Sequence, residues 1–284
     1  MDRFETYLGL LTLVGRAKYQ TFAYLKERVW KKLQGWKRRM LSRAGKEVLI
    51  KAMAQSIPTY TMEVFFLPAK LCDELDALCA RFWWGQTGDE RKIHWKSWSF
   101  LTQPKKVGGM GFRDLRSFNL AMLAKQGWRM IQDQNSLLSR CFLEATDCPN
   151  SFYVWKSVLA SQQILKKWCY WRVGTGSSIR VMEDKGIPNH LGNKTLFPIE
   201  YDEWEWRVSD LIDWRVNQRD RDKIYTTFNH FDAEAILRIP LSRRQVQDRV
   251  VWMHCSNGKY AVKSRYRVAC MLAEDAIGRE ECSE

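Results

Sequence analysis

The sequence predicts a mainly α-helical protein whose second half is a smaller α+β region with short hairpins. Apolar residues recur at helical spacing through the first half, and Ser, Pro and Gly stand where helices would begin and end. After residue 150, short β-prone runs flank Gly-rich turns. With 284 residues and 45% apolar content, the chain can form one large or two ordinary domains.

The first predicted helix is amphipathic and strongly basic. Its apolar stripe, about 80° wide, consists of Phe22, Leu25, Val29, Leu33, Trp36 and Met40. The opposite face carries Arg28, Lys31, Lys32, Arg38 and Arg39. Gly35 lies within this basic face, where it would let a phosphate backbone approach closely or would mark a helix break at Gln34–Gly35. Both interpretations are open.

Two further helices follow. Ser42 can cap a helix that Pro58 stops near Ile57. The next helix begins after Pro68 and ends at Gly85. Acidic residues in its early turns suit the helix dipole and predict packing rather than phosphate binding. Its two cysteines would share one face as small buried residues, because they are seven positions apart, at Cys72 and Cys79.

A glycine-rich segment, Gly108 to Gly111, follows Lys105 and Lys106. It lacks the residue order of a phosphate-binding loop and no apolar strand precedes it. The segment therefore predicts a plain turn that leads into a helix from Asp114 to about Ile131.

The second half predicts two hairpins. The first pairs Trp168–Arg172 with Ser178–Glu183 around a Gly-rich turn, and the second pairs Val251–Met253 with Tyr260–Val262 around an Asn-Gly turn. The remaining predicted elements are short helices at Ser209–Trp214 and Asp232–Leu237 and an irregular connection at Asn189–Trp206.

The positive charge is concentrated in the first half of the chain. The net charge is +14 overall, of which residues 1–140 hold +13 and residues 141–284 hold +1. Between Arg16 and Lys51 only Glu27 and Glu47 oppose the basic residues. Cations gathered on one surface are typical of a protein that binds a polyanion, because they release counterions condensed on phosphates. The alternative is an ordinary solvated helix face.

Residue patterns of catalysis and metal binding are missing. Phosphoryl transfer needs carboxylates that converge on metal ions, and the nearest approach, Tyr201 to Trp204, lies in the irregular connection and is interpreted as a solvated acidic turn. The eight cysteines form no C-x-x-C pair and have no histidine at zinc spacing. We therefore expect no catalytic residue, no metal and no cofactor.

The sequence also carries no signal for a membrane. The apolar run Leu8 to Val14 is too short to span one, and acidic rather than basic residues precede it. Thiols that stay reduced are typical of intracellular proteins. We expect an intracellular protein of the nucleus or cytoplasm, without a secretory or transmembrane segment.

Several motifs, in order, resemble plant non-LTR (LINE-type) retrotransposon reverse transcriptases. They run through nearly the whole chain and include Tyr7–Gly9, Leu13–Arg16, Trp30–Lys37, Leu41–Ala52, Ile57–Tyr60, Phe82–Gly85, His94–Trp95, Pro104–Leu115, Phe118–Gln126, Trp171–Gly174, Ile239–Ser242 and Asn257–Ser264. Departures from the family pattern, such as Leu11 and Met182, suggest a decayed or truncated reading frame.

The resemblance implies a division of the chain. Residues 1–15 would be a remnant of a palm strand, 16–65 a thumb-like basic helical segment, and 66–140 a helical connector. A helix with the Gly-turn hairpin (141–188) and a linker (189–206) would follow, and 207–284 would be the truncated start of a zinc-binding C-terminal module. The palm with the catalytic carboxylates would precede residue 1.

The resemblance and the charge pattern together predict a non-catalytic fragment of an RNA-directed DNA polymerase that binds a template–primer duplex. The predicted phosphate contacts are Arg28, Lys31, Lys32, Lys37, Arg38, Arg39, Arg43 and Lys46. Other reverse transcriptase domains are further expected partners. Two alternatives stay open: a decayed relic without function, and a scaffold fragment that docks other domains through exposed aromatic residues, including Trp83, Trp84, Trp204 and Trp206.

Overall fold

The computed structural model divides the chain into two compact units. Unit 1 comprises residues 1–127, 141–163 and 262–284, and unit 2 comprises residues 128–140 and 164–261. The structure describes residues 6–7, 10–11, 14–15, 17–37, 41–85, 92–133, 137, 152–187, 195, 205–242 and 246–268. Within these residues the chain is mainly helical with a few short antiparallel strand pairs, as the sequence predicts.

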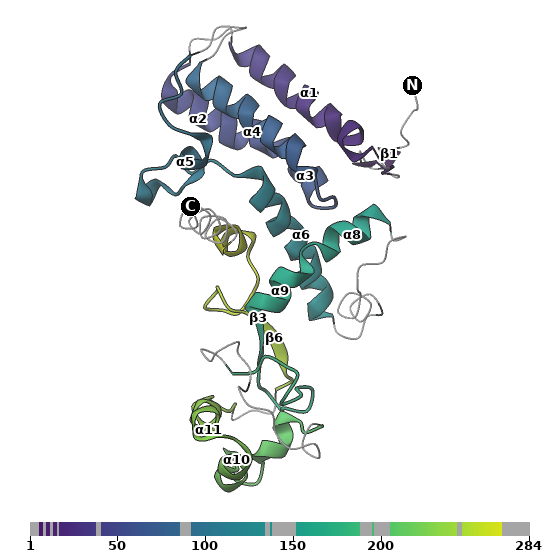
Figure 1. The fold of residues 1–284 in the computed structure, drawn as a ribbon, viewed down its shortest axis with the longest axis vertical. Helices are drawn as coiled ribbons and strands as arrows, with labels where there is room; N and C mark the ends of the chain where they lie inside the picture. The colour runs from purple at the N-terminus through teal and green to yellow at the C-terminus, as the bar shows by residue number, and fades with distance from the viewer. Residues whose placement is uncertain are drawn as a thin grey trace, which may run out of the picture. The chain divides into compact units, whose positions relative to one another are not determined.

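Three helices of unit 1 form its best-packed part (Figure 1). α1 (Lys18–Lys37) and α2 (Arg43–Ala52) both pack against α4 (Ala69–Trp84). A 3₁₀ turn, η1 (Ala54–Ser56), and the short helix α3 (Thr59–Met62) connect α2 to α4. The apolar stripe of α1 faces this core as predicted, with its most buried members at Phe22, Leu25, Val29 and Leu33.

The predicted start of α2 and end of α4 are confirmed, whereas the helix end expected near Ile57 is wrong, because α2 ends at Ala52 and the 3₁₀ turn η1 follows it. Ser42 caps α2, because its hydroxyl accepts a hydrogen bond from the amide of Gly45 at 3.2 Å. Gly85 ends α4 in the left-handed conformation with φ of 73°. Cys72 and Cys79 are buried on α4, as predicted. α1 continues through Gly35 to Lys37, so the interpretation of Gly35 as a helix break is wrong.

The rest of unit 1 is also helical. It contains α5 (Trp98–Thr102), the 3₁₀ turn η2 (Lys105–Val107), most of α6 (Leu115–Gln132), α8 (Tyr153–Leu159) and a helical segment over residues 262–268. Near the first residues, β1 (Thr6–Tyr7) pairs with β2 (Leu10–Leu11) in an antiparallel arrangement. The turn and helix predicted over Gly108 to Ile131 are confirmed, and the Asp114 carboxylate accepts from the Ser117 amide at 2.9 Å.

A buried asparagine of α6 fixes the connection between α3 and α4. The Asn119 side chain is fully buried, accepts from the amide of Leu67 at 2.8 Å, and donates to the carbonyls of Met62 and Phe65 at 2.9 Å each. All its hydrogen bonds go to backbone groups that would otherwise be unsatisfied in the core. Asn119 therefore positions this connection on α6.

Unit 2 is a small α+β region. Its elements are most of α9 (Gln162–Trp168), β3 (Cys169–Arg172), η5 (Val208–Leu211), β4 (Ile212–Asp213), β5 (Gln218–Arg219), α10 (Arg221–Thr227), α11 (His230–Leu237) and β6 (Arg249–Trp252). The helix expected at Ser209–Trp214 is in fact a 3₁₀ turn followed by β4, which pairs with β5. α11 agrees with the helix predicted at Asp232–Leu237.

The first predicted hairpin is wrong in its strand partner. β3 pairs with β6, with Cys169 opposite Trp252, and not with the segment after the Gly turn. The reason is the buried carboxylate of Asp248, which accepts from the amides of Gly174 and Gly176 at 2.7 and 2.8 Å and from Ser178 at 2.9 Å. Asp248 therefore closes the turn and brings β6 alongside β3.

The second predicted hairpin is half correct. β6 exists, and a tight turn follows it, in which the Trp252 amide donates to the carbonyl of Gly258 at 2.8 Å and Gly258 has φ of 68°. The second strand is absent at Tyr260–Val262, because the chain enters the helix over residues 262–268 there.

Candidate nucleic-acid interface

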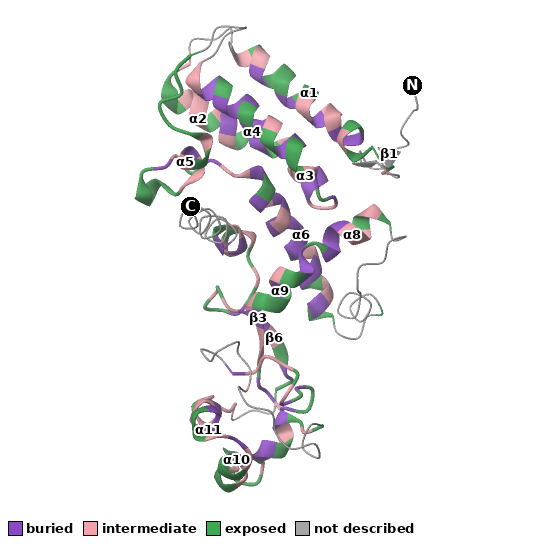
Figure 2. Cartoon of the chain, viewed as in Figure 1, coloured by how far each residue is buried: buried purple, intermediate pink, exposed green. Residues whose placement is uncertain are grey.

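The outer face of α1 carries the first group of predicted phosphate contacts. Arg28, Lys31 and Lys32 are exposed, outside the buried stripe of the helix. Along α1, Figure 2 shows exposed positions in green as well as buried positions in purple. None of the three makes an ion pair with an acid in the described part of the chain. These three residues, the α1 ridge, can therefore offer their charges to a ligand.

Other cations of α1 are used inside the protein. Lys26 forms an ion pair with Glu74 of α4 at 2.8 Å, and the Tyr19 hydroxyl donates to the same carboxylate at 2.6 Å. Hydrogen bonds from Lys26 and Tyr19 lower the pKa of Glu74. The Lys18 ammonium lies 4.6 Å from the ring centroid of Tyr153. Glu74 therefore helps to hold α4 against α1, which agrees with the packing role predicted for the acidic residues of α4.

The N-terminal end of α2 carries the second group. The exposed Arg43 guanidinium lies 5.5 and 5.4 Å from the ring centroids of Trp83 and Trp84. Lys46 is half-buried beside the end of α4, where a Cβ atom on Gly85 would lie 3.2 Å from its Nζ. Burial, and then the charges of Arg43 and Lys92, lower the pKa of Lys46. This end of α2 is therefore crowded with positive charge.

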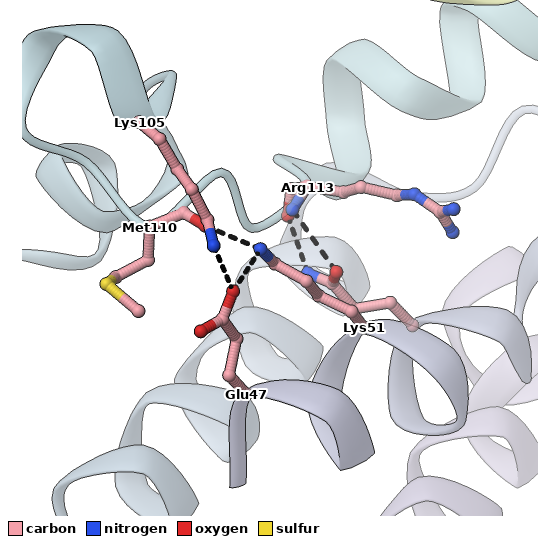
Figure 3. A network of polar contacts seen from close by, with 6 residues as sticks. Glu47, Lys51, Lys105, Met110 and Arg113 are labelled. Atoms are coloured by element: carbon pink, nitrogen blue, oxygen red, sulfur yellow. Dashed lines mark hydrogen bonds and ion pairs between the residues drawn. The ribbon is translucent and has the colours of Figure 1, made fainter. Parts of the chain in front are cut away.

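The C-terminal half of α2 is different, because its cation is neutralised (Figure 3). Lys51 and Lys105 each lie 2.8 Å from the carboxylate of Glu47, and Lys51 also donates to the carbonyl of Met110 at 2.6 Å. Hydrogen bonds from Lys105 and Lys51 lower the pKa of Glu47. The Gln55 side chain donates to the carbonyl of Arg113 at 2.9 Å and accepts from its amide at 3.2 Å. The turn over residues 105–113 is held on α2 and η1 by these contacts.

The predicted site therefore separates into described and undescribed parts. The structure describes Arg28, Lys31 and Lys32 on α1 and brings Arg43 and Lys46 together at α2. Lys37 is the last residue of α1, and its side chain is not described, while Arg38 and Arg39 lie outside the described residues. Sequence reasoning missed Lys92 and His94 beside the second group, although the basic and aromatic residues around His94–Trp95 were a usable signal.

No helix of the described residues is long and apolar enough to cross a membrane. In the same part of the chain, no three His, Cys, Asp or Glu side chains come together as a metal site would require. The acidic turn at Tyr201 to Trp204 lies outside the described residues.

Relatives in Arabidopsis thaliana place the chain in a family. No model of a known protein family matches it. It is 34% identical to "Uncharacterized mitochondrial protein AtMg00310", in a match that covers 93% of that protein and 46% of this chain. The chain belongs to the same family as this Arabidopsis protein. It is also 30% identical, over 93% of its length, to "Putative ribonuclease H protein At1g65750".

The chain spans 44% of the length of the relative named as a ribonuclease H protein. Both relationships are consistent with a retrotransposon-derived protein. The motifs of the sequence also resemble proteins of retrotransposons.

Proposed function

We propose that this chain is the thumb and connector of a plant LINE-type reverse transcriptase and binds a template–primer duplex without catalysing a reaction itself. The observation that carries the proposal is the α1 ridge, whose three cations are exposed and free of acid partners in the described residues. Arg43 and Lys46 add charge at the start of α2. The ordered motifs support the reverse transcriptase family, and the relative named as a ribonuclease H protein is consistent with a retrotransposon origin.

The spacing of the ridge suits a phosphate backbone. α1 is rigid because its opposite side is buried against α4. The rise from Arg28 to Lys32 is about 6 Å at 1.5 Å per residue, and one strand of a duplex carries a phosphate for about each 3.4 Å of axis. The ridge can therefore contact about two neighbouring phosphates. Such contacts position a duplex without reading its bases.

The scaffold alternative is weakened, because some of the aromatic residues that it needs at the surface are packed inside the protein. Trp83, which that interpretation expects at the surface, is only 5% exposed and packs edge-on against Phe112. Trp206 packs against the core of unit 2 and lies under the Lys223 ammonium at 4.0 Å. Trp204 lies outside the described residues. These aromatic rings therefore give little support to a docking surface.

The test is duplex binding by a variant that carries Arg28→Ala, Lys31→Ala and Lys32→Ala. Because this variant cannot bind the roughly two phosphates that the ridge would neutralise, the slope of log affinity against log salt should fall in steepness by about 2 for B-form DNA. Affinity at low salt should fall at least about tenfold. Fluorescence anisotropy of a labelled duplex at several salt concentrations measures both.

A charge-matched control replaces three exposed cations of α6, Arg116, Lys125 and Arg129, by Ala. Because this control variant keeps the α1 ridge, it should retain most of the steepness of log affinity against log salt. Circular dichroism should report an unchanged helix content for both variants. An equal fall in affinity for the two variants would mean that net charge alone binds the duplex, and an unchanged affinity of the ridge variant would favour the scaffold role.

A further inference from the structure

A surface at the end of α4 combines cations with flat aromatic rings. The Arg43 guanidinium lies 5.4 Å from the ring centroid of Trp84, and the Trp84 and His94 rings stack with centroids 5.9 Å apart and 22° between their planes. Trp95, next in the chain, is 73% exposed. We call Arg43, Lys46, Trp84, His94 and Trp95 the aromatic–cationic patch.

The positive charge of this patch favours the binding of an anion. Arg43 and Lys46 form no ion pair with an acid among the described residues. The pKa of Lys46 is lowered by burial first and then by the charges of Arg43 and Lys92. A phosphate placed among these cations would relieve their mutual repulsion. In this respect the patch and the α1 ridge are alike.

The aromatic rings distinguish the patch from the ridge. The bases of a duplex are paired and stacked on one another, so a duplex offers mainly phosphates to a protein surface of this kind. An unpaired strand exposes the faces of its bases, which stack on aromatic side chains without sequence preference. Exposed rings beside cations that have no acid partner in the described residues are therefore complementary to an unpaired strand, in both its bases and its phosphates.

We propose that the aromatic–cationic patch binds an unpaired segment of a nucleic-acid strand. The bases stack on Trp95 and His94, and Arg43 and Lys46 contact the phosphates. The inference rests on the proposed function and extends it, because a template strand longer than its primer supplies an unpaired segment adjoining the duplex. The second group of cations then has a ligand of its own.

The experiment compares two labelled strands of equal length and charge: oligo-dT and a strand whose residues are abasic. The full chain should bind oligo-dT at least about fivefold more tightly, since stacking on one aromatic side chain contributes about that factor or more. Trp95→Ala should remove most of this preference, while Trp95→Tyr should retain it. Phe152→Ala is the matched control, because Phe152 is an exposed ring outside the patch at 80% exposure.

An oligo-U strand in parallel distinguishes RNA from DNA as the source of the unpaired bases. Equal binding of oligo-dT and the abasic strand by the full chain would overturn the proposal, and so would a Trp95→Ala variant that keeps the preference. Measuring duplex affinity in the same variants distinguishes a failure of this proposal from a failure of the proposed function. Trp95→Ala should leave duplex affinity unchanged, whereas the triple α1 ridge variant should lower it.

Discussion

The turn over residues 105–113 and the α1 ridge are both basic, yet they use their charge in opposite ways. In the turn region, Lys51 and Lys105 share the carboxylate of Glu47. On the ridge, Arg28, Lys31 and Lys32 have no acid partner in the described residues. A count of positive charge therefore overestimates the surface that is available to a polyanion.

The two regions also differ in the space around a glycine. Gly109 is buried, and a Cβ atom there would lie 2.1 Å from the carbonyl oxygen of Gln103. Gly35 is exposed within α1, and a Cβ atom there would meet nothing within 4 Å. The turn region is thus fixed by close backbone packing, whereas the ridge has open space above it.

The largest expected effect is that of Gly109→Ala. The added methyl group cannot fit against Gln103, so the turn must open and the ion pairs of Lys51 and Lys105 must shift. We expect a decrease of about 3 kcal/mol in the free energy of unfolding, measured by urea denaturation followed by circular dichroism. A decrease below about 0.5 kcal/mol, the size of an ordinary surface substitution, would contradict the packing described for this turn.

The next effect is that of Glu47→Gln, which removes the charge shared by Lys51 and Lys105. At pH 7 we expect a destabilisation of about 1 kcal/mol. The pKa of Glu47 lies below its ordinary value of 4.5 in the folded protein. Its stabilising contribution is therefore complete above pH 4.5 and is lost as the pH falls through the lower folded value.

Urea denaturation of both proteins at pH 7 and at successively lower pH checks this dependence. The difference between the wild-type chain and Glu47→Gln should shrink below pH 4.5. A difference that stays constant across this range would show that the shared carboxylate does not stabilise the turn through its charge.

The smallest effect has the opposite sign. Gly35→Ala should stabilise α1 by about 0.5 to 1 kcal/mol, because Ala restricts the unfolded chain and favours a helix interior. Thermal denaturation measures the gain. If a phosphate backbone approaches the ridge closely at this position, the same variant should bind a duplex more weakly despite its higher stability. A stabilised variant with unchanged duplex affinity would exclude the close approach while keeping the ridge.

Features encoded locally were predicted well. The stripe of α1, the Ser42 cap and the Gly85 helix end each depend on residues within one or two helical turns. The ion pair of Glu47 with Lys51 is equally local, because residues four apart share a helix face, although it was not predicted. Only the scaffold alternative, in contrast, expected Trp83 and Trp84 both at the surface. Neighbours on a helix point about 100° apart, and Trp83 points into the core.

Features that join distant residues had no local signal. Lys105 reaches Glu47 from 58 positions along the chain, and nothing in either segment indicates the other. Asp248 accepts from the Gly174 amide across 74 positions, so the first hairpin was assigned to the neighbouring segment instead of β6. Such contacts decide whether each cation is paired with an acid. The cations of the α1 ridge could therefore be placed on their helix from the sequence, but whether they are available to a ligand could not be predicted.

Asp248 also sets an order of events during synthesis. The ribosome extends the chain from its N-terminus, so the Gly turn and β3 emerge long before the carboxylate and the strand that complete them. Closing so long a loop is entropically costly until those contacts form. Unit 2 must therefore wait for β6 to be translated, while α1, α2 and α4 can already pack on one another within the first 85 residues and gain the contacts of Lys105 and Phe112 soon afterwards.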